Sequence, residues 1–198
     1  MIEEKILVAT TNSGKFKEIK SFLSDLPVSM YSLKQAQIDK SFPEQGHTFL
    51  ENARGKSLFY SEEWDGLTLG EDSGLEIDYL HGAPGVLSAR FSGPQATDEK
   101  NIQKVLKLLQ DVPYENRKAR FVASMVLSQK GKIIKEIQEF APGTITFEKK
   151  GHSGFGYDPI FYYPPLQKTF AQLSSEEKNA VSHRGRALRK LKEFLHQY

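Results

Sequence analysis

The segment Thr10–Lys15 (TTNSGK) is rich in groups that bind phosphate, and it follows the apolar run Lys5–Thr10. That run predicts a buried strand, and the stretch Lys15–Leu26 predicts a helix ending before Pro27. Free backbone N–H groups and the helix dipole attract phosphate at such a junction. Candidate phosphate-binding residues are therefore Thr10, Thr11, Asn12, Ser13, Gly14 and Lys15. An Asn-Gly type of turn with a helix N-cap explains the same residues about equally well.

Glu71-Asp72-Ser73-Gly74 places two acids and a hydroxyl together. We expect strands at Leu67–Glu71 and Leu75–Tyr79 with a turn at the DSG residues. Neighbouring strand residues face opposite ways, so only one acid addresses a given site unless the turn begins at Asp72. Glu44, in the loop before a predicted helix, is a second candidate for the same place, and Mg²⁺ takes only one or two protein carboxylates. The simpler alternatives are an ordinary Asx turn at Asp72-Ser73-Gly74 and a Glu44 side chain that is merely solvated.

A third group is the glycine-rich stretch Gly154–Pro159. Its two glycines allow the backbone to approach a flat ligand, on which Phe155 or Tyr157 could stack, and Asp158 could accept from a base N–H. The simpler alternative is a glycine-rich entry into a strand with core aromatics. The stretch is not a dinucleotide fingerprint, because proline stands at the third glycine position, and TTNSGK is not a P-loop, because Ala9 and Phe16 replace required residues.

The fourth group, Lys178 with Ser182-His183-Arg184, is rich in hydrogen-bond donors. Lysine, arginine and one histidine nitrogen complement the carbonyl of a 6-oxo purine, whereas adenine presents an amino group there. Unpaired buried donors make such discrimination strong. Because more basic residues follow up to Lys192, a solvated basic face or a nucleic-acid patch is the alternative.

The elements around these groups alternate between helix and strand. Capping patterns and apolar spacing predict three further helices, and alternation on either side of Gln129–Lys132 predicts a long hairpin. One helix is predicted by the capping pair Thr48 and Glu51, and a second by Thr97 followed by the apolar residues Ile102, Val105, Leu106 and Leu109. The C-terminal helical region is predicted by the capping pair Ser174 and Glu177 and by the later apolar residues Leu188, Leu191 and Leu195. The two strands of the hairpin are residues 119–128 and 133–140. The sequence predicts a mixed α/β fold in one domain, residues 1–198.

Composition narrows the class of protein. The chain has 198 residues, 38% of them hydrophobic and 26% charged, with a net charge of +2 and no cysteine. No apolar run approaches the roughly 20 residues of a membrane span, and disulfides and thiolate chemistry are excluded. Two acids precede the first strand where an export signal would be basic. We expect a cytoplasmic protein that binds neither membrane nor nucleic acid.

Taken in order, these motifs resemble the inosine triphosphate pyrophosphatase family, the RdgB-like purine house-cleaning enzymes. The resemblance runs from Ile6 to Leu195, and its five ordered motifs are specific as a set. They are TTNSGK, FxENAxxK at 49–56, EDSGLxxDxLxGxPGxxSARFSG at 71–93, GFGYDPIF and EKNAxSHRGxAL.

The resemblance implies an elongated α/β fold, with a long mixed sheet flanked by helices and two lobes on either side of an active-site cleft, and a homodimer. It implies hydrolysis of dITP/ITP and dXTP/XTP to the monophosphate and pyrophosphate, by attack of water on the α-phosphate. It further implies that Thr10–Lys15 bind the triphosphate, that Glu44 and Asp72 bind Mg²⁺, and that Asp72 is also the proton acceptor. Ser73 would contact the nucleotide, and Phe155, Gly156, Tyr157 and Asp158 would enclose the base. Lys178, His183 and Arg184 would recognise the oxygenated edge of the base.

Two positions depart from the family pattern. Glu71 stands where many bacterial relatives have aspartate, so its supporting role is open, and Ser57 stands where alanine is frequent, for which we expect no consequence. Three rival functions remain: a pyrophosphatase for pyrimidine or methylated nucleotides, a nucleic-acid-binding protein using the basic terminal helix, and an inactive nucleotide sensor. The preserved Glu44, Asp72 and Lys15 count against the sensor.

Overall fold

The computed structural model describes residues 4–198. Residues 1–3, on which part of the expectation of no export signal rests, lie outside it. In chain order the main elements are β1 (Glu4–Ala9), α1 (Ser13–Phe22), β2 (Val28–Ser32), α2 (Phe49–Ser61), β3 (Leu67–Ile77), α3 (Asp98–Leu108), β4 (Lys118–Gln129), β5 (Lys132–Ile145), β6 (Phe161–Tyr163), β7 (Lys168–Thr169), α4 (Ser175–Val181) and α5 (His183–Leu195).

The strands form one seven-stranded mixed sheet in the order β2-β1-β3-β4-β5-β6-β7. β1 pairs in parallel with β2 and β3, whereas β6 is antiparallel to β5 and β7. The predicted hairpin is confirmed as β4 and β5, joined at Lys130 and Gly131, whose φ angles of 46° and 72° suit the tight turn of a twisted hairpin. The predicted mixed α/β fold is thus confirmed.

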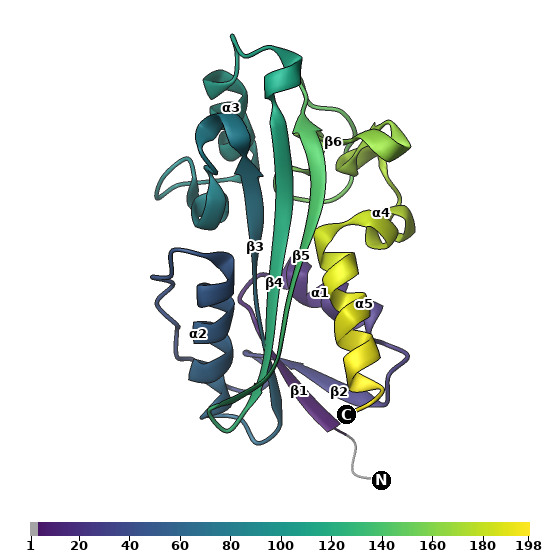
Figure 1. The fold of residues 1–198 in the computed structure, drawn as a ribbon. Helices are drawn as coiled ribbons and strands as arrows, with labels where there is room; N and C mark the ends of the chain where they lie inside the picture. The colour runs from purple at the N-terminus through teal and green to yellow at the C-terminus, as the bar shows by residue number, and fades with distance from the viewer. Residues whose placement is uncertain (1–3) are drawn as a thin grey trace. The chain divides into compact units, whose positions relative to one another are not determined.

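The chain divides into two compact units. The first runs to Asp72 and includes Ala123–Glu139 and Ala187–Tyr198. Its helices cover both faces of the sheet (Figure 1), and alternation along β1 shows why. Ile6 and Val8 pack in the cluster that holds Ile19 of α1 and Leu188 and Leu191 of α5, while Leu7 and Ala9 pack with Tyr60 of α2.

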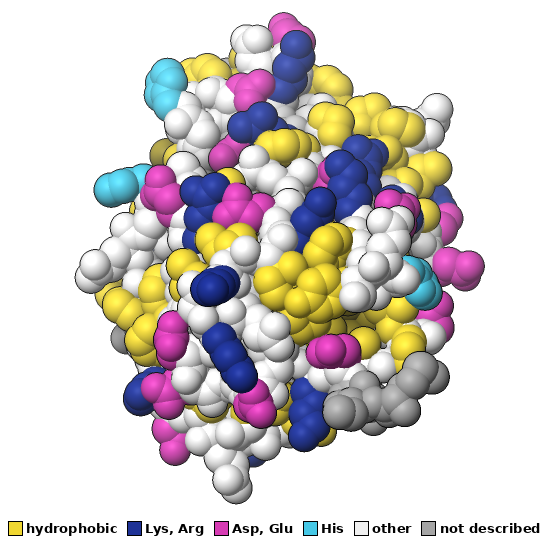
Figure 2. Space-filling model, turned by 60° about the horizontal axis from the view of Figure 1, so that its bottom comes forward, with side chains coloured by type: hydrophobic (Ala, Val, Ile, Leu, Met, Phe, Trp, Pro, Cys, Tyr) yellow, Lys and Arg dark blue, Asp and Glu magenta, His cyan; other side chains and the backbone are white. Residues whose placement is uncertain are grey.

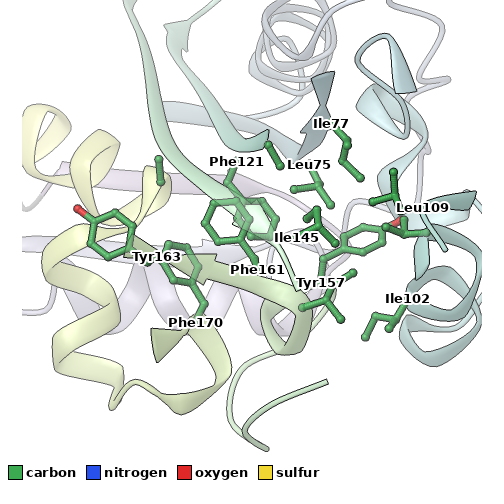
Figure 3. Packing of buried hydrophobic residues seen from close by; sticks show 14 of the residues in the cluster. Leu75, Ile77, Ile102, Leu109, Phe121, Ile145, Tyr157, Phe161, Tyr163 and Phe170 are labelled. Atoms are coloured by element: carbon green, nitrogen blue, oxygen red, sulfur yellow. The ribbon is translucent and has the colours of Figure 1, made fainter. Parts of the chain in front are cut away.

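The second unit comprises Ser73–Val122 and Phe140–Arg186. Its core is a cluster of aliphatic and aromatic side chains in which the predicted stripe of α3 is buried (Figure 3). Its central members are Leu75, Ile77, Ile102, Val105, Leu109, Phe121, Ile145, Tyr157, Phe161, Tyr163 and Phe170. The predictions of a single domain and of a cleft between two lobes stay predictions.

The predicted DSG turn is wrong. β3 runs without a break from Leu67 to Ile77, through Asp72, Ser73 and Gly74. β3 continues as a strand of the sheet through these residues, and the Leu75 N–H that follows them donates to Ser88 Oγ at 2.9 Å. The Asp72 and Ser73 side chains have partners elsewhere, described below, and the local turn preference is overridden.

Two helix predictions also need correction. α1 ends at Phe22 rather than Leu26, because the chain turns at Leu23 while Leu26 still packs in the core. The apolar residues that suggested a longer helix therefore continue beyond its end. At α2, Thr48 Oγ1 accepts from the Glu51 N–H at 3.1 Å, but Glu51 reaches back to the N–H of His47 at 2.8 Å rather than to the N-cap, so only half of the capping box forms. The box at Ser174 and Glu177 is complete.

Candidate active site

Glu71 and Asp72 project from opposite faces of β3, as their adjacent positions in a strand require. On one face Lys15 Nζ of α1 lies 2.8 Å from Glu71 Oε2, whose side chain is fully buried. On the other face Asp72 meets α2, where Asn52 Nδ2 donates to Asp72 Oδ2 at 3.0 Å. Glu71 thus holds Lys15, which gives a physical role to the first acid of the pair.

Lys56 of α2 brings Glu44 and Asp72 to a common point. Its Nζ lies 2.5 Å from Glu44 Oε1 and 3.3 Å from Asp72 Oδ1, and it donates to the Glu71 carbonyl oxygen at 3.2 Å. Asn52 fixes the loop that carries Glu44, because its Oδ1 accepts from the Gly46 N–H at 2.8 Å. The two acids expected to share a site therefore do so, around a buried ammonium.

These charges shift one another's pKa values. Burial disfavours the charged Lys56, but the carboxylates of Asp72, Glu44 and Glu71 outweigh that effect, so the pKa of Lys56 lies above its ordinary value. Burial raises the pKa of Asp72; Lys56 and Lys15 oppose this rise, and Glu71 and Glu44 reinforce it. A carboxylate with a raised pKa is a stronger proton acceptor, which suits Asp72 to general-base chemistry.

The segment Thr10–Lys15 forms the link between β1 and α1, as predicted. Asn12 is the N-cap of α1, its Oδ1 accepting from the Lys15 N–H at 3.0 Å, and Thr10 Oγ1 accepts from the Asn12 N–H at 3.2 Å. Thr11, Asn12 and Ser13 are exposed, and Gly14 is partly exposed. Because Ala9 pairs with Gly70, the loop leaves the sheet beside Glu71 and Asp72. A polyphosphate at this helix start would lie near Lys15.

Within the second unit, two cationic side chains lie near the ring of Phe155. Lys178 Nζ lies 4.8 Å and Arg184 Cζ 5.5 Å from the ring centroid, and Arg184 Nη2 donates to Ser73 Oγ at 2.8 Å. Lys178 and Arg184 are 8% and 4% exposed, which is unusual for such side chains and makes a merely solvated basic face untenable for them. Predicted residues from three distant segments thus meet in one place.

The loop at 154–158 is held by side chains of its own unit. Asp158, 2% exposed, accepts from the Phe155 N–H at 2.9 Å and lies 2.5 Å from Lys178 Nζ, both through Oδ2. Gly154 has φ +80°, and a Cβ there would collide with that carboxylate. Gly156 donates to Asp98 Oδ2 at 2.7 Å. The structure therefore gives Asp158 contacts that position the loop.

Tyr157 and His183 are both buried, but they make different kinds of contact. Tyr157 is 4% exposed, belongs to the core cluster and donates from its hydroxyl to the Ser88 carbonyl oxygen at 2.8 Å, so it packs as a core aromatic while Phe155 remains partly exposed. His183, 4% exposed, stacks on Phe121 with ring centroids 4.7 Å apart and an angle of 8° between the planes.

Two residues of this site, Asn52 and Lys56, were missed as candidates although they lie within the FxENAxxK motif. Both are buried, at 1% and 8% exposure. They are four positions apart on α2 and so share one face of the helix, the face that packs on the sheet. Polar residues four positions apart on an otherwise buried helix face were the sequence signal that could have identified them as site residues.

The chemistry of the donor set fits a small hard cation. Within residues 4–198 no group of three or more His, Cys, Asp or Glu side chains could hold a metal ion. Glu44 and Asp72 nevertheless offer carboxylate oxygens to one cation, Lys56 Nζ. Two carboxylates suffice for Mg²⁺, which keeps waters and takes phosphate oxygens as further ligands.

Two basic residues of the terminal helix α5 have acidic partners. Lys192 lies 2.5 Å from Asp25, and Lys190 pairs with Glu139. Acidic and basic side chains are interspersed on the face shown in Figure 2. None of the helices in the described part of the chain combines the length and apolar composition that a bilayer crossing requires.

Comparison with known proteins places the chain in a family. The model of the Ham1 family matches residues 6–194, and the chain therefore belongs to the Ham1 family. A curated relative from Caldanaerobacter subterraneus subsp. tengcongensis, named dITP/XTP pyrophosphatase, is 44% identical over 194 residues, with 96% of each chain covered. A protein of the same name from Escherichia coli O157:H7 is 43% identical, covering 97% of this chain and 98% of that one.

Solved structures agree with the fold. The HAM1 protein from Coxiella burnetii matches with a TM-score of 0.89 and 38% identity, covering 98% of this chain and all of the other (100%). The Staphylococcus aureus Ham1 protein matches with a TM-score of 0.88 at 38% identity, covering 98% and 99% of the two chains.

Proposed function

We propose that this protein hydrolyses noncanonical purine nucleoside triphosphates, dITP/ITP and dXTP/XTP, to the nucleoside monophosphate and pyrophosphate. Such an activity keeps deaminated purines out of DNA and RNA. The names of the curated relatives support the substrate class. The convergence of Glu44 and Asp72 on Lys56 is the observation that carries the reaction type.

The roles proposed for the first unit follow from its contacts. The start of α1, from Thr10 to Gly14, offers backbone N–H groups to the triphosphate, and Lys15 and Lys56 supply positive charge. Asp72 orients a water molecule and accepts its proton as the water oxygen attacks the α-phosphorus. The bond between the α-phosphorus and the bridging oxygen breaks, and pyrophosphate leaves with that oxygen.

Glu44 and Asp72 would hold Mg²⁺ in this protein. When bound, that ion neutralises charge on the phosphate oxygens and so favours the transition state. The second unit would bind the nucleoside: Phe155 offers a face to the base, Ser73 contacts the nucleotide, and Lys178, His183 and Arg184 present donors to the 6-oxo edge. Gly156, Tyr157 and Asp158 shape the loop that carries Phe155.

Pyrophosphate release across a panel of triphosphates, with and without Mg²⁺, tests the proposal. We expect release from ITP, dITP and XTP to exceed release from ATP and pyrimidine triphosphates, and to require the metal. Preferential turnover of a pyrimidine or methylated nucleotide would refute the substrate class. Binding of ITP without release would indicate a sensor, and Mg²⁺-independent affinity for nucleic acid that falls steeply with salt would indicate the third rival function.

We also propose a homodimer in the cytoplasm, on the family resemblance and on the substrates, which belong to the nucleotide pool. Light scattering of the purified protein over a range of concentrations tests the oligomeric state, and a monomer at all concentrations would contradict it.

A further inference from the structure

The imidazole of His183 is held in a defined plane. His183 is the first residue of α5, and Ser182 Oγ accepts from the Gly185 N–H at 3.0 Å, which fixes the backbone at this helix start. The ring itself lies nearly parallel to Phe121, with 8° between the planes and 4.7 Å between the centroids. The helix start therefore fixes the backbone at His183, and the stack on Phe121 fixes the plane of its ring.

Phe121 is in turn well anchored. It lies on β4 and is 6% exposed. Its ring is stacked with Phe170 at 5.7 Å and 6°, and Phe161 packs against it at 4.5 Å with a tilt of 53° (Figure 3). The three rings of His183, Phe121 and Phe170 are thus close to parallel, and Phe121 cannot rotate without displacing other core aromatics.

The orientation matters because the N–H bonds of an imidazole lie in the plane of its ring. Fixing that plane restricts the directions in which His183 can donate, whereas a ring free to turn about its second torsion spreads its donor over many directions. The neighbouring donor Arg184 is fixed by a different contact, its bond to Ser73. The orientations of His183 and Arg184 are therefore fixed by different neighbours, Phe121 and Ser73.

We propose that Phe121 is a positioning residue that sets the plane of His183 and thereby contributes to selectivity for purines with a 6-oxo group. The inference rests on the proposed function and extends it to a buried residue of the core. Simple core packing is the competing explanation of Phe121, and it predicts that loss of the ring weakens the fold without changing which base is preferred.

The test compares Phe121→Leu with Phe91→Leu, a control that removes a ring packed against the same cluster, because no ring contact joins Phe91 to Phe121 or His183 among those described. The readout is the ratio of kcat/KM for ITP to kcat/KM for ATP, with the melting temperature measured in parallel. We expect Phe121→Leu to lower the ratio by about 2- to 10-fold, the factor to which the stacking of one aromatic pair corresponds, and Phe91→Leu to leave it unchanged. Phe121→Tyr, which keeps a flat ring, should retain the parent ratio.

A second arm removes the histidine. In the His183→Ala background, Phe121→Leu should have no further effect on the ratio, because the ring no longer has an imidazole to orient. If Phe121→Leu fails to fold, Phe121→Met replaces it, since methionine fills a similar volume without a flat face.

Two results would overturn the inference: equal ratios for Phe121→Leu and Phe91→Leu, or an unchanged effect of Phe121→Leu when His183 is absent. Failure of the proposed function itself has a different signature, because the parent protein would then release no pyrophosphate from ITP.

Discussion

Replacing Lys56 by methionine removes the cation around which the acidic residues gather, at nearly constant side-chain length. Its Nζ contacts Glu44 at 2.5 Å and Asp72 at 3.3 Å, and the Lys56, Glu44 and Asp72 side chains are 11%, 32% and 10% exposed. Breaking a buried ion pair typically costs about 3–5 kcal/mol. Because Glu44 is partly solvated, we take the lower end, and about 3 kcal/mol corresponds to a fall in Tm of about 6–12 °C for a chain of this size.

Thermal unfolding in EDTA measures this change, and Lys40→Met is the matched control. Lys40 pairs with Glu63 at the surface, where the two side chains are 61% and 42% exposed. Exposed pairs contribute about 0–1 kcal/mol, so the control should melt within a few degrees of the parent.

Adding Mg²⁺ tests the same carboxylates as a cation site. The ion would restore the lost positive charge, so Mg²⁺ should raise the Tm of Lys56→Met more than that of the parent protein. Ligand at about 100 times its Kd stabilises by about 2.7 kcal/mol, which would recover most of the loss. The reasoning would be refuted if Lys56→Met had the same Tm in EDTA as the Lys40→Met control. It would also be refuted if Mg²⁺ did not raise the Tm of Lys56→Met.

Three further predictions concern β3 and α2. Asp72→Asn should fold, as judged by circular dichroism, but lose turnover of ITP by about 10²- to 10⁴-fold, and near-parental activity would contradict its role as proton acceptor. Ser57→Ala should lower the free energy of unfolding in urea by about 1–3 kcal/mol, since the fully buried Ser57 hydroxyl donates to the Thr68 carbonyl oxygen at 3.0 Å; an unchanged midpoint would uphold our original expectation of no consequence. Gly70→Ala should cost more than Ser57→Ala in the same assay, because its Cβ would collide with the Ala53 carbonyl oxygen, and equal midpoints would show that α2 can shift.

Local signals were sufficient for most of the fold. Thr48, Thr97 and Ser174 each accept a hydrogen bond from the residue three positions on, as N-cap residues do. The alternation in β4 and the apolar stripe of α3 also gave the right elements. These features depend on residues within one or two turns of each other, so the sequence contains the information directly.

The contacts of β3 could not be predicted in the same way. Whether DSG turns or continues as a strand depends on how β3 pairs within the sheet, and the partner of each acid depends on which helix covers which face. Lys15 and Lys56 reach Glu71 and Asp72 from opposite sides, and Tyr157 rather than Phe155 enters the core. All of these contacts join segments that are distant in sequence, for which motif spacing gives no geometry.

The alternation of Glu71 and Asp72 across β3 has a consequence for sequence change in this family. A single inserted or deleted residue between Leu69 and Glu71 would turn every later side chain of the strand to the other face. Each lysine would then meet the wrong acid, and Ser73 would lose Arg184. Related chains should therefore tolerate gaps in their surface loops but align without any through this stretch of β3.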